Sequence, residues 1–140
     1  SDMRVLIVDD SRTMRRIIIN TLQKLGYKDC FEASNGREGI EQLAAQQVDI
    51  IITDWNMPEM SGVDFTRVVR ANEQTKHVPV LMITANAAED DIVEAMRAGV
   101  NNYVVKPFTP DTLKEKIDAV LAARLQHQDN VTVVKLEQVS

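Results

Sequence analysis

This sequence has a single cysteine, fewer basic than acidic residues and no long apolar run. Its single cysteine, Cys30, allows no internal disulfide and no cysteine-based metal site. One isolated cysteine is typical of proteins from a reducing compartment. No apolar run is long enough to span a membrane, and no secretory signal sequence is evident. We therefore expect a cytoplasmic protein that does not use a membrane as a partner.

Charge and length narrow the function classes further. The chain carries 21 acidic and 16 basic residues, which gives a formal net charge of −5. An acidic chain is poorly suited to bind nucleic acid, so we expect no direct nucleic-acid contact. A chain of 140 residues suits one domain, on the usual prior of about 100–200 residues per domain. This length is also sufficient to bury a hydrophobic core.

Strand and helix patterns alternate strictly along the chain. Short apolar runs predict five strands, at residues 4–8, 28–34, 49–54, 78–84 and 102–105. Apolar residues at helical spacing predict five helices, at residues 12–25, 37–47, 63–71, 89–98 and from 110 onward. In the third of these helices we expect Phe65, Val68 and Val69 to face the core. This alternation predicts an α/β fold, with a parallel sheet covered on both faces and right-handed crossovers.

Residues 126–140 break this alternation. They begin with the polar segment QHQDN and continue with the β-branched segment VTVVKLEQV. Such a terminal segment is most often a frayed tail or a linker. The alternative is an added strand or a segment that docks on a partner. We therefore divide the chain into one domain at residues 3–125 and a C-terminal segment at residues 126–140.

The most informative stretch is Asp49 to Gly62, which reads DIIITDWNMPEMSG. Its three isoleucines and threonine are typical of a strand that is buried on both faces of a parallel sheet. This run ends in an acid, Asp54. Ligands of open α/β sheets bind outside the carboxyl ends of the strands. Asp54 is therefore poorly placed to stabilise the fold and well placed for chemistry.

Polar side chains stand at the same point of three other predicted strands. Asp9 and Asp10 follow the first strand, Thr84 ends the fourth, and Lys106 follows the fifth. Because the carboxyl ends of parallel strands share one edge, we expect these residues to converge on Asp54. Three carboxylates cannot stay ionised together without counter-charge, and Lys106 supplies only one positive charge. The remaining negative charge predicts a hard divalent cation with oxygen ligands, namely Mg²⁺.

A carboxylate beside Mg²⁺ can attack phosphorus and form an aspartyl phosphate. In that reaction Lys106 would neutralise phosphoryl oxygens, and Thr84 would donate a hydrogen bond to one of them. A lone acid at a strand end is usually a helix cap, and Asp9 or Asp10 alone could be one. A set of five residues at four strand ends is much harder to explain by capping.

The same segments carry a family resemblance. They resemble the receiver domains of response regulators, above all those of the chemotaxis regulators, in VDDSRTMRR (8–16), DWNMPEMSG (54–62), MITA (82–85) and YVVKPF (103–108). The resemblance covers residues 3–124 and implies a doubly wound, flavodoxin-like sheet with five flanking helices. It also implies the strand order 2-1-3-4-5, which comes from the family and not from the residue pattern.

The resemblance also assigns roles to residues of the site. Asp54 matches the phosphoacceptor, and Asp9 and Asp10 match the metal-binding acid pair. The backbone carbonyl of Asn56 matches a further ligand of Mg²⁺, which Asp54 also contacts. Lys106 matches the lysine that pairs with the acceptor and then with the phosphoryl group.

Two further residues match the family's switch. Thr84 matches the switch hydroxyl, and Tyr103 matches the aromatic residue that turns inward on activation. The peptide bond between Lys106 and Pro107 matches one that is cis in the family, which is otherwise uncommon. Activation would then alter partner binding on the face formed by the fourth helix, the fifth strand and the fifth helix.

The resemblance implies a signalling protein that assists its own phosphorylation and dephosphorylation, and not an enzyme with a separate substrate. Its implied partners are a histidine kinase as phosphodonor, a protein that binds the phosphorylated form, and a phosphatase. The flagellar motor switch is a candidate target, in keeping with a role in chemotaxis or motility. Asn86 stands two positions after Thr84, where chemotaxis regulators often carry an acid, at a position that tunes dephosphorylation.

Three alternatives stand beside this hypothesis. The chain could be the receiver domain of a larger regulator with its output elsewhere. It could be an aspartyl-phosphate phosphatase of the haloacid dehalogenase class, although that class has a DxD pattern where this chain has adjacent Asp9 and Asp10. It could also be a pseudo-receiver without chemistry, which the intact site argues against. The arginines near Asp10, namely Arg12, Arg15 and Arg16, could steer a phosphodonor, although a solvated helix face is the default interpretation.

Overall fold

The computed structural model describes residues 3–85 and 87–123, so the segment expected at 126–140 lies outside the described residues. The strands are β1 (Arg4–Val8), β2 (Asp29–Ala33), β3 (Ile50–Asp54), β4 (Val80–Thr84) and β5 (Asn102–Val105). The helices are α1 (Arg12–Lys24), α2 (Gly36–Ala45), α3 (Gly62–Ala71), α4 (Glu89–Ala98) and a C-terminal helix described over residues 110–123. None of the described helices combines the length and apolar character needed to cross a membrane.

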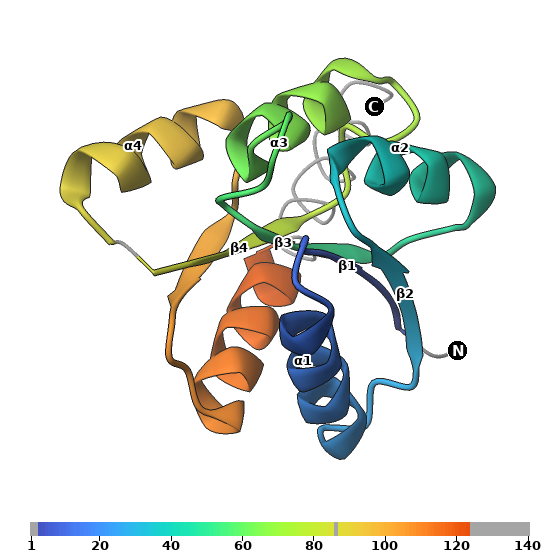
Figure 1. The fold of residues 1–140 in the computed structure, drawn as a ribbon, viewed down its shortest axis with the longest axis vertical. Coiled ribbons are helices and arrows are strands. Elements are labelled where there is room, and N and C mark those ends of the chain that lie inside the picture. Colours follow the sequence, from blue (N-terminus) through green and yellow to red (C-terminus); the bar gives the residue numbers. More distant parts are fainter. Residues whose placement is uncertain (1–2, 86, 124–140) are drawn as a thin grey trace, which may run out of the picture.

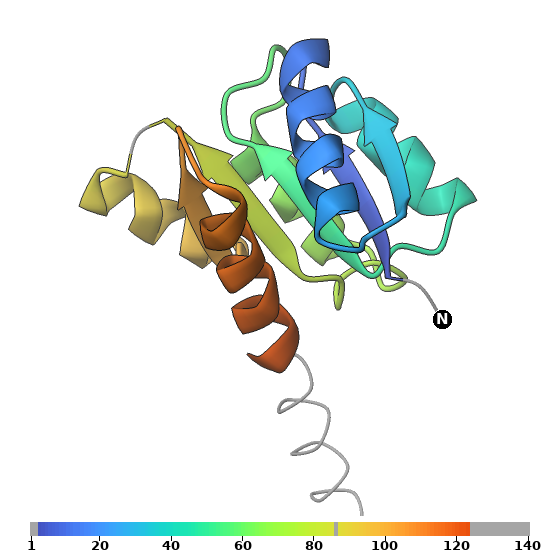
Figure 2. The same ribbon diagram turned by 90° about the horizontal axis from the view of Figure 1, so that it is seen from below.

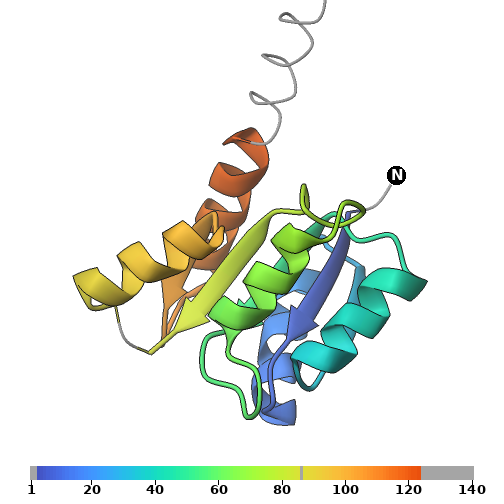
Figure 3. The same cartoon turned by 90° about the horizontal axis from the view of Figure 1, so that it is seen from above.

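The strands form one parallel sheet in the order β2-β1-β3-β4-β5, which confirms the expected flavodoxin-like order (Figure 1). One face is covered by α1 and the C-terminal helix, which lie in front of the sheet in Figure 2. The other face is covered by α2, α3 and α4, which lie in front of it in Figure 3. A sheet covered on both faces explains why the inner strands β1, β3 and β4 are almost continuously apolar.

The central strands divide the core into two layers. Every residue of β3 and β4 is buried, and successive side chains point to opposite faces of the sheet. In β3, Ile51 joins the layer under α2, α3 and α4, where Phe65 is fully buried. Ile50 and Ile52 join the layer under α1 and the C-terminal helix. This packing holds the carboxyl end of β3, where Asp54 lies, between two rigid layers.

The expectation that Val68 faces the core is wrong. Phe65 and Val69 are buried as expected, but Val68 is 39% exposed. The inward position is taken by Thr66, whose hydroxyl donates a 2.8 Å hydrogen bond to the carbonyl oxygen of Gly62. A hydroxyl satisfied by its own helix can be buried at little cost, so the buried arc of α3 is centred on Thr66 and Val69.

Arg70, at the end of α3, connects two segments that are distant in sequence. Its guanidinium donates to the carbonyl oxygens of Lys76 and Val78, just before β4. It also donates two hydrogen bonds to the carbonyl oxygen of Gly99, which ends α4, and one to Oδ1 of Asn101. A single side chain therefore fixes the end of α3, the approach to β4 and the turn between α4 and β5.

Candidate functional site

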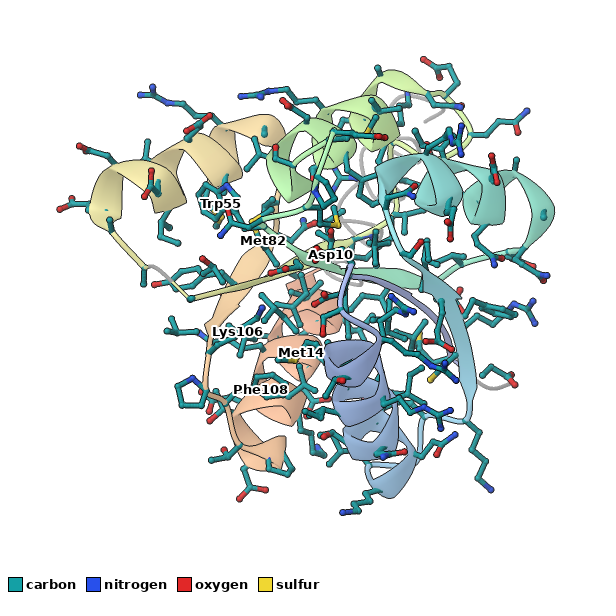
Figure 4. All side chains as sticks on the ribbon, in the orientation of Figure 1. Asp10, Met14, Trp55, Met82, Lys106 and Phe108 are labelled. Carbon is teal, nitrogen blue, oxygen red and sulfur yellow. The ribbon has the colours of Figure 1, made fainter. Side chains whose placement is uncertain are left out.

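The carboxyl ends of β1, β3, β4 and β5 meet at one edge of the sheet, as the sequence predicts. Figure 4 looks onto this region, where Asp10, Trp55 and Lys106 are labelled. Carboxylate oxygens of Asp9, Asp10 and Asp54 all lie within 4.8 Å of one another. The convergence of acids from β1 and β3 with a lysine from β5 is therefore confirmed, whereas their chemical roles stay predictions.

Asp54 is the last residue of β3 and is 8% exposed. Its Oδ1 atom accepts a 2.9 Å hydrogen bond from the backbone N–H of Trp55 and a 3.1 Å hydrogen bond from Nζ of Lys106. Among the described residues, both hydrogen bonds to this carboxylate go to Oδ1, and Oδ2 accepts none.

Lys106 reaches this carboxylate from a well-fixed backbone. Its N–H donates a 2.8 Å hydrogen bond to the carbonyl oxygen of Thr84, which extends the pairing of β5 with β4 by one residue. The peptide bond between Lys106 and Pro107 is cis, as the family resemblance implies. The side chain is 24% exposed, so the ammonium lies at the rim of the site and not beneath it.

Asp9 is the most buried of the three acids, with 1% of its surface exposed, whereas Asp10 is exposed. The Oδ1 atom of Asp9 accepts a 2.8 Å hydrogen bond from the N–H of Ser11. Its Oδ2 atom is buried with no hydrogen-bond partner among the described residues. Burial raises the pKa of Asp9, as does the nearby charge of Asp54, while the Ser11 hydrogen bond and Lys106 lower that pKa. The carboxylate is therefore held in a place that is unfavourable for its charged form.

This arrangement fits a divalent cation. A buried carboxylate oxygen without a partner is costly, and such groups in native proteins call for an explanation. The residue with this orphaned oxygen, Asp9, also belongs to the cluster of carboxylate oxygens that includes Asp10 and Asp54. A set made only of oxygen donors with excess negative charge is what Mg²⁺ prefers.

A hollow opens beside Asp54 on the side of β4. It has a volume of about 240 Å³ and is lined by Trp55, Asn56, Thr84 and Asp91. Thr84 is buried at the end of β4, while Asn56 is exposed. The contribution of Asp91 was missed because its position in the sequence suggests only a favourable charge at the start of α4.

Gly62 closes the loop that follows Asp54. Its N–H donates a 2.7 Å hydrogen bond to the carbonyl oxygen of Trp55, at the first residue of α3. A Cβ atom at this position would overlap the carbonyl oxygen of Asp54. Glycine is therefore needed for α3 to begin against the end of β3. The sequence shows this glycine directly after the N-cap Ser61, but only the fold shows what it touches.

Tyr103 lies on β5 opposite Met82 of β4, two residues before the pair formed by Thr84 and Val105. Its side chain is half-buried and packs against the core layer under α2, α3 and α4. Nζ of Lys116, from the C-terminal helix, lies 5.6 Å from the centre of the ring. A cation at that distance is attracted by the face of the ring.

The basic cluster at the start of α1 is not a uniformly solvated helix face. Arg12 and Arg16 are exposed, as expected for solvated residues. The side chain of Arg15 is only 13% exposed. Its Nη1 atom donates a 2.6 Å hydrogen bond to the carbonyl oxygen of Asp9, and its Nε atom lies 2.9 Å from Oε1 of Glu32. Sequence spacing offered no signal for the contact between Arg15 and Glu32, because Arg15 lies on α1 and Glu32 lies on β2.

Comparisons with known proteins agree with this geometry. Residues 5–118 match the response regulator receiver domain family. The chain is 53% identical to chemotaxis protein CheY1 of Helicobacter pylori over 120 residues, which are 85% of this chain and 97% of that protein. It is 54% identical to chemotaxis protein CheY of Pseudomonas aeruginosa over 118 residues, which are 84% of this chain and 95% of that protein.

Solved structures give the same result. The chemotaxis protein CheY4 of Vibrio cholerae aligns with a TM-score of 0.81 at 37% identity, over 86% of this chain and 99% of that one. The receiver domain of a sensor histidine kinase from Pseudomonas aeruginosa aligns with a TM-score of 0.78 at 29% identity, over 87% and 99%. That receiver domain contains a magnesium ion coordinated in its active-site cleft.

Proposed function

The chain belongs to the response regulator receiver domain family, among its CheY-like chemotaxis members, and we propose that phosphorylation of Asp54 switches its binding to partner proteins. The observation that best supports this proposal is the 3.1 Å contact between Lys106 and Asp54, at an edge where three carboxylates converge. Capping or surface solvation would not require an acid cluster and a lysine from three different strand ends.

Phosphoryl transfer would begin at the free oxygen of Asp54. Oδ2 attacks the phosphorus of a phosphohistidine in the partner kinase, the P–N bond breaks, and the imidazole leaves with its electron pair. Trp55 and Lys106 hold Oδ1 from the backbone and from the side chain, which orients Oδ2. Lys106 then stabilises the added charge on the phosphoryl oxygens.

Asp9, Asp10, Asp54 and the carbonyl oxygen of Asn56 would hold Mg²⁺ at this edge. When bound, the ion supplies positive charge that offsets the acids and the phosphoryl oxygens. Asp9 has the buried oxygen that most needs such a partner. The carbonyl of Asn56 belongs to the loop that Gly62 closes through its hydrogen bond to Trp55, and a closed loop supports its role as a ligand.

Thr84 and Tyr103 would transmit the effect of phosphorylation from Asp54 to the protein surface. The hydroxyl of Thr84 would follow a phosphoryl oxygen, and Tyr103 would move into the space behind it. This movement would change the face formed by α4, β5 and the C-terminal helix. The partners of that cycle are a histidine kinase, a target such as the flagellar motor switch, and a phosphatase.

Incubation with acetyl phosphate and Mg²⁺, followed by intact-mass spectrometry, tests the proposal. The wild type is expected to gain one phosphoryl group and Asp54→Asn none. Asp64→Asn, which alters an exposed acid on α3, serves as the matched control and should be phosphorylated like the wild type. A phosphatase would instead turn over the donor, and a pseudo-receiver would show neither result. Full phosphorylation of Asp54→Asn would overturn the assignment.

A further inference from the structure

We infer that Arg15 is a positioning residue for the acidic site, because its guanidinium fixes the peptide group from which both Asp9 and Asp10 extend. The inference rests on the proposed function, since it takes Mg²⁺ as the ion that these acids bind. Arg15 itself lies on α1 and is not a ligand. It acts on the site through the backbone carbonyl of Asp9, immediately after β1.

The guanidinium of Arg15 joins three elements. Nη1 donates a 2.6 Å hydrogen bond to the carbonyl oxygen of Asp9, immediately after β1. Nε forms an ion pair of 2.9 Å with Oε1 of Glu32 on β2. The Arg15 side chain is 13% exposed and that of Glu32 is 47% exposed, so the hydrogen bond to the Asp9 carbonyl is better shielded from water than the ion pair. Glu32 thus holds the guanidinium in place, and the guanidinium holds the carbonyl.

The carbonyl in question belongs to the peptide bond between Asp9 and Asp10. A peptide group is planar and includes the Cα atoms of both residues, so fixing its oxygen limits how either acid can rotate. Two other hydrogen bonds fix the backbone and the side chain of Asp9. The N–H of Asp9 donates to the carbonyl oxygen of Ala33 at 3.1 Å, and the N–H of Ser11 donates to Oδ1 of Asp9 at 2.8 Å. Oδ2 of Asp9 is left buried without a partner among the described residues.

Positioning and simple electrostatics predict opposite results when Arg15 is replaced. Removing a positive charge near three acids would, by electrostatics alone, make Mg²⁺ bind more tightly. Removing a group that holds the acids in place would make Mg²⁺ bind more weakly. Loss of a residue that orients metal ligands typically costs about 10–100-fold in metal affinity. The direction of the change therefore distinguishes the two roles.

Titration of the metal-free protein with Mg²⁺ tests the inference. The fluorescence of Trp55, the one tryptophan of the chain, reports binding, because this residue directly follows Asp54 and its backbone N–H donates to Oδ1 of Asp54. Arg15→Met keeps most of the side-chain stem, and we expect it to raise the Mg²⁺ dissociation constant about tenfold. Arg16→Met removes the same charge from an exposed position on the same helix, and its dissociation constant should stay at or below the wild-type value.

Arg15→Lys should give partial rescue, because an ammonium can reach one of the two acceptors but lacks the rigid fork of arginine. Thermal melts in a chelator establish that each variant is folded. If Arg15→Met does not fold, Arg15→Lys decides, with an expected dissociation constant severalfold above that of the wild type. Wild-type or tighter Mg²⁺ binding by a folded Arg15 variant would overturn the inference. Absence of Mg²⁺ binding by the wild type itself would instead count against the proposed function.

Discussion

Nζ of Lys106 lies 3.1 Å from Oδ1 of Asp54, although 52 positions separate the two residues in the sequence. The two strands that carry them, β5 and β3, are not neighbours, because β4 lies between them. Lys106 therefore extends past the end of β4, where Thr84 accepts a hydrogen bond from its N–H. Lys106 thus connects the carboxylate of Asp54 with the backbone at the end of β4.

Mg²⁺ is expected to raise the melting temperature, because the three acids repel one another and, among the described residues, Lys106 is the one cation that forms an ion pair with any of them. An ion that binds only the folded state, at ten times its dissociation constant, adds about 1.4 kcal/mol, or roughly 5 °C. Asp10→Asn should raise the melting temperature of the metal-free protein and reduce the shift caused by Mg²⁺. Differential scanning calorimetry with Mg²⁺ or with a chelator measures both effects. An unchanged melting temperature in millimolar Mg²⁺ would contradict the acidic site.

The metal-free protein is expected to lose stability as the pH rises through the pKa of Asp9. Burial raises that pKa in the folded state, so the folded protein binds the proton more tightly than the unfolded chain does. The resulting stability is fully present below the unfolded-state pKa and is lost as the pH rises through the folded-state pKa. The pKa of Asp9 also depends on the charges of Asp54, Asp10 and Lys106 in the same site. The effect of Asp9 must therefore be isolated by comparing the wild type with a variant that differs only at Asp9.

Asp9→Asn provides that comparison, because the amide oxygen can still accept from Ser11. We expect the variant to be more stable than the wild type at pH 7 in a chelator, and the difference to shrink as the pH falls toward 4. Urea unfolding at several pH values measures this difference. A difference that stays constant with pH would show that burial of the Asp9 charge is not its cause.

Thr84→Ala is expected to uncouple phosphorylation from output. In the wild type, a beryllofluoride mimic of the phosphoryl group should raise the affinity for a flagellar motor switch protein, within the usual coupling range of about 5–150-fold. The variant lacks the hydroxyl that would follow the phosphoryl oxygen, so most of this gain should disappear. Calorimetric titration with and without the mimic provides the measurement. If Thr84→Ala keeps the full gain, Tyr103 is only a half-buried strand residue and the relay is wrong.

Arg70→Ala is expected to destabilise the fold by about 2–3 kcal/mol, because it leaves several carbonyl oxygens without their charged donor. Arg67→Ala is the matched control on the same helix, since Arg67 is exposed and its ion pairs within the described part of the chain are those with Asp64 and Glu94. Exposed pairs contribute about 0–1 kcal/mol, so Arg67→Ala should have little effect. Urea unfolding of both variants at pH 7 is the test, and equal losses would argue against a special role for Arg70.

The positions of the strands and of the reactive residues could be read from the sequence, because both depend on local patterns. A continuous apolar run such as IIIT needs burial on both faces, and burial on both faces requires a parallel sheet covered by helices. Parallel strands then bring their carboxyl ends to one edge, which explains why Asp9, Asp54 and Lys106 were predicted to converge. The order of the strands was not available from these patterns and came only from the family resemblance.

Local patterns were less informative where a polar side chain has a partner. The apolar pattern of α3 placed Val68 in the core, but Thr66 is buried there because its hydroxyl bonds to Gly62. Hydrophobicity describes what a side chain loses by leaving water, and it does not include the hydrogen bond that the side chain forms inside.

The sequence by itself determined which acids, which lysine and which threonine end the strands. The tertiary structure alone decided how these groups are held. Arg15 lies six positions from Asp9 and seventeen from Glu32, and no periodicity joins the three. Their contacts exist because β1 and β2 pair in parallel register while α1 packs beside them. Side-chain contacts between elements depend on distances that only the folded backbone sets, whereas strand and helix patterns depend on neighbours in the chain.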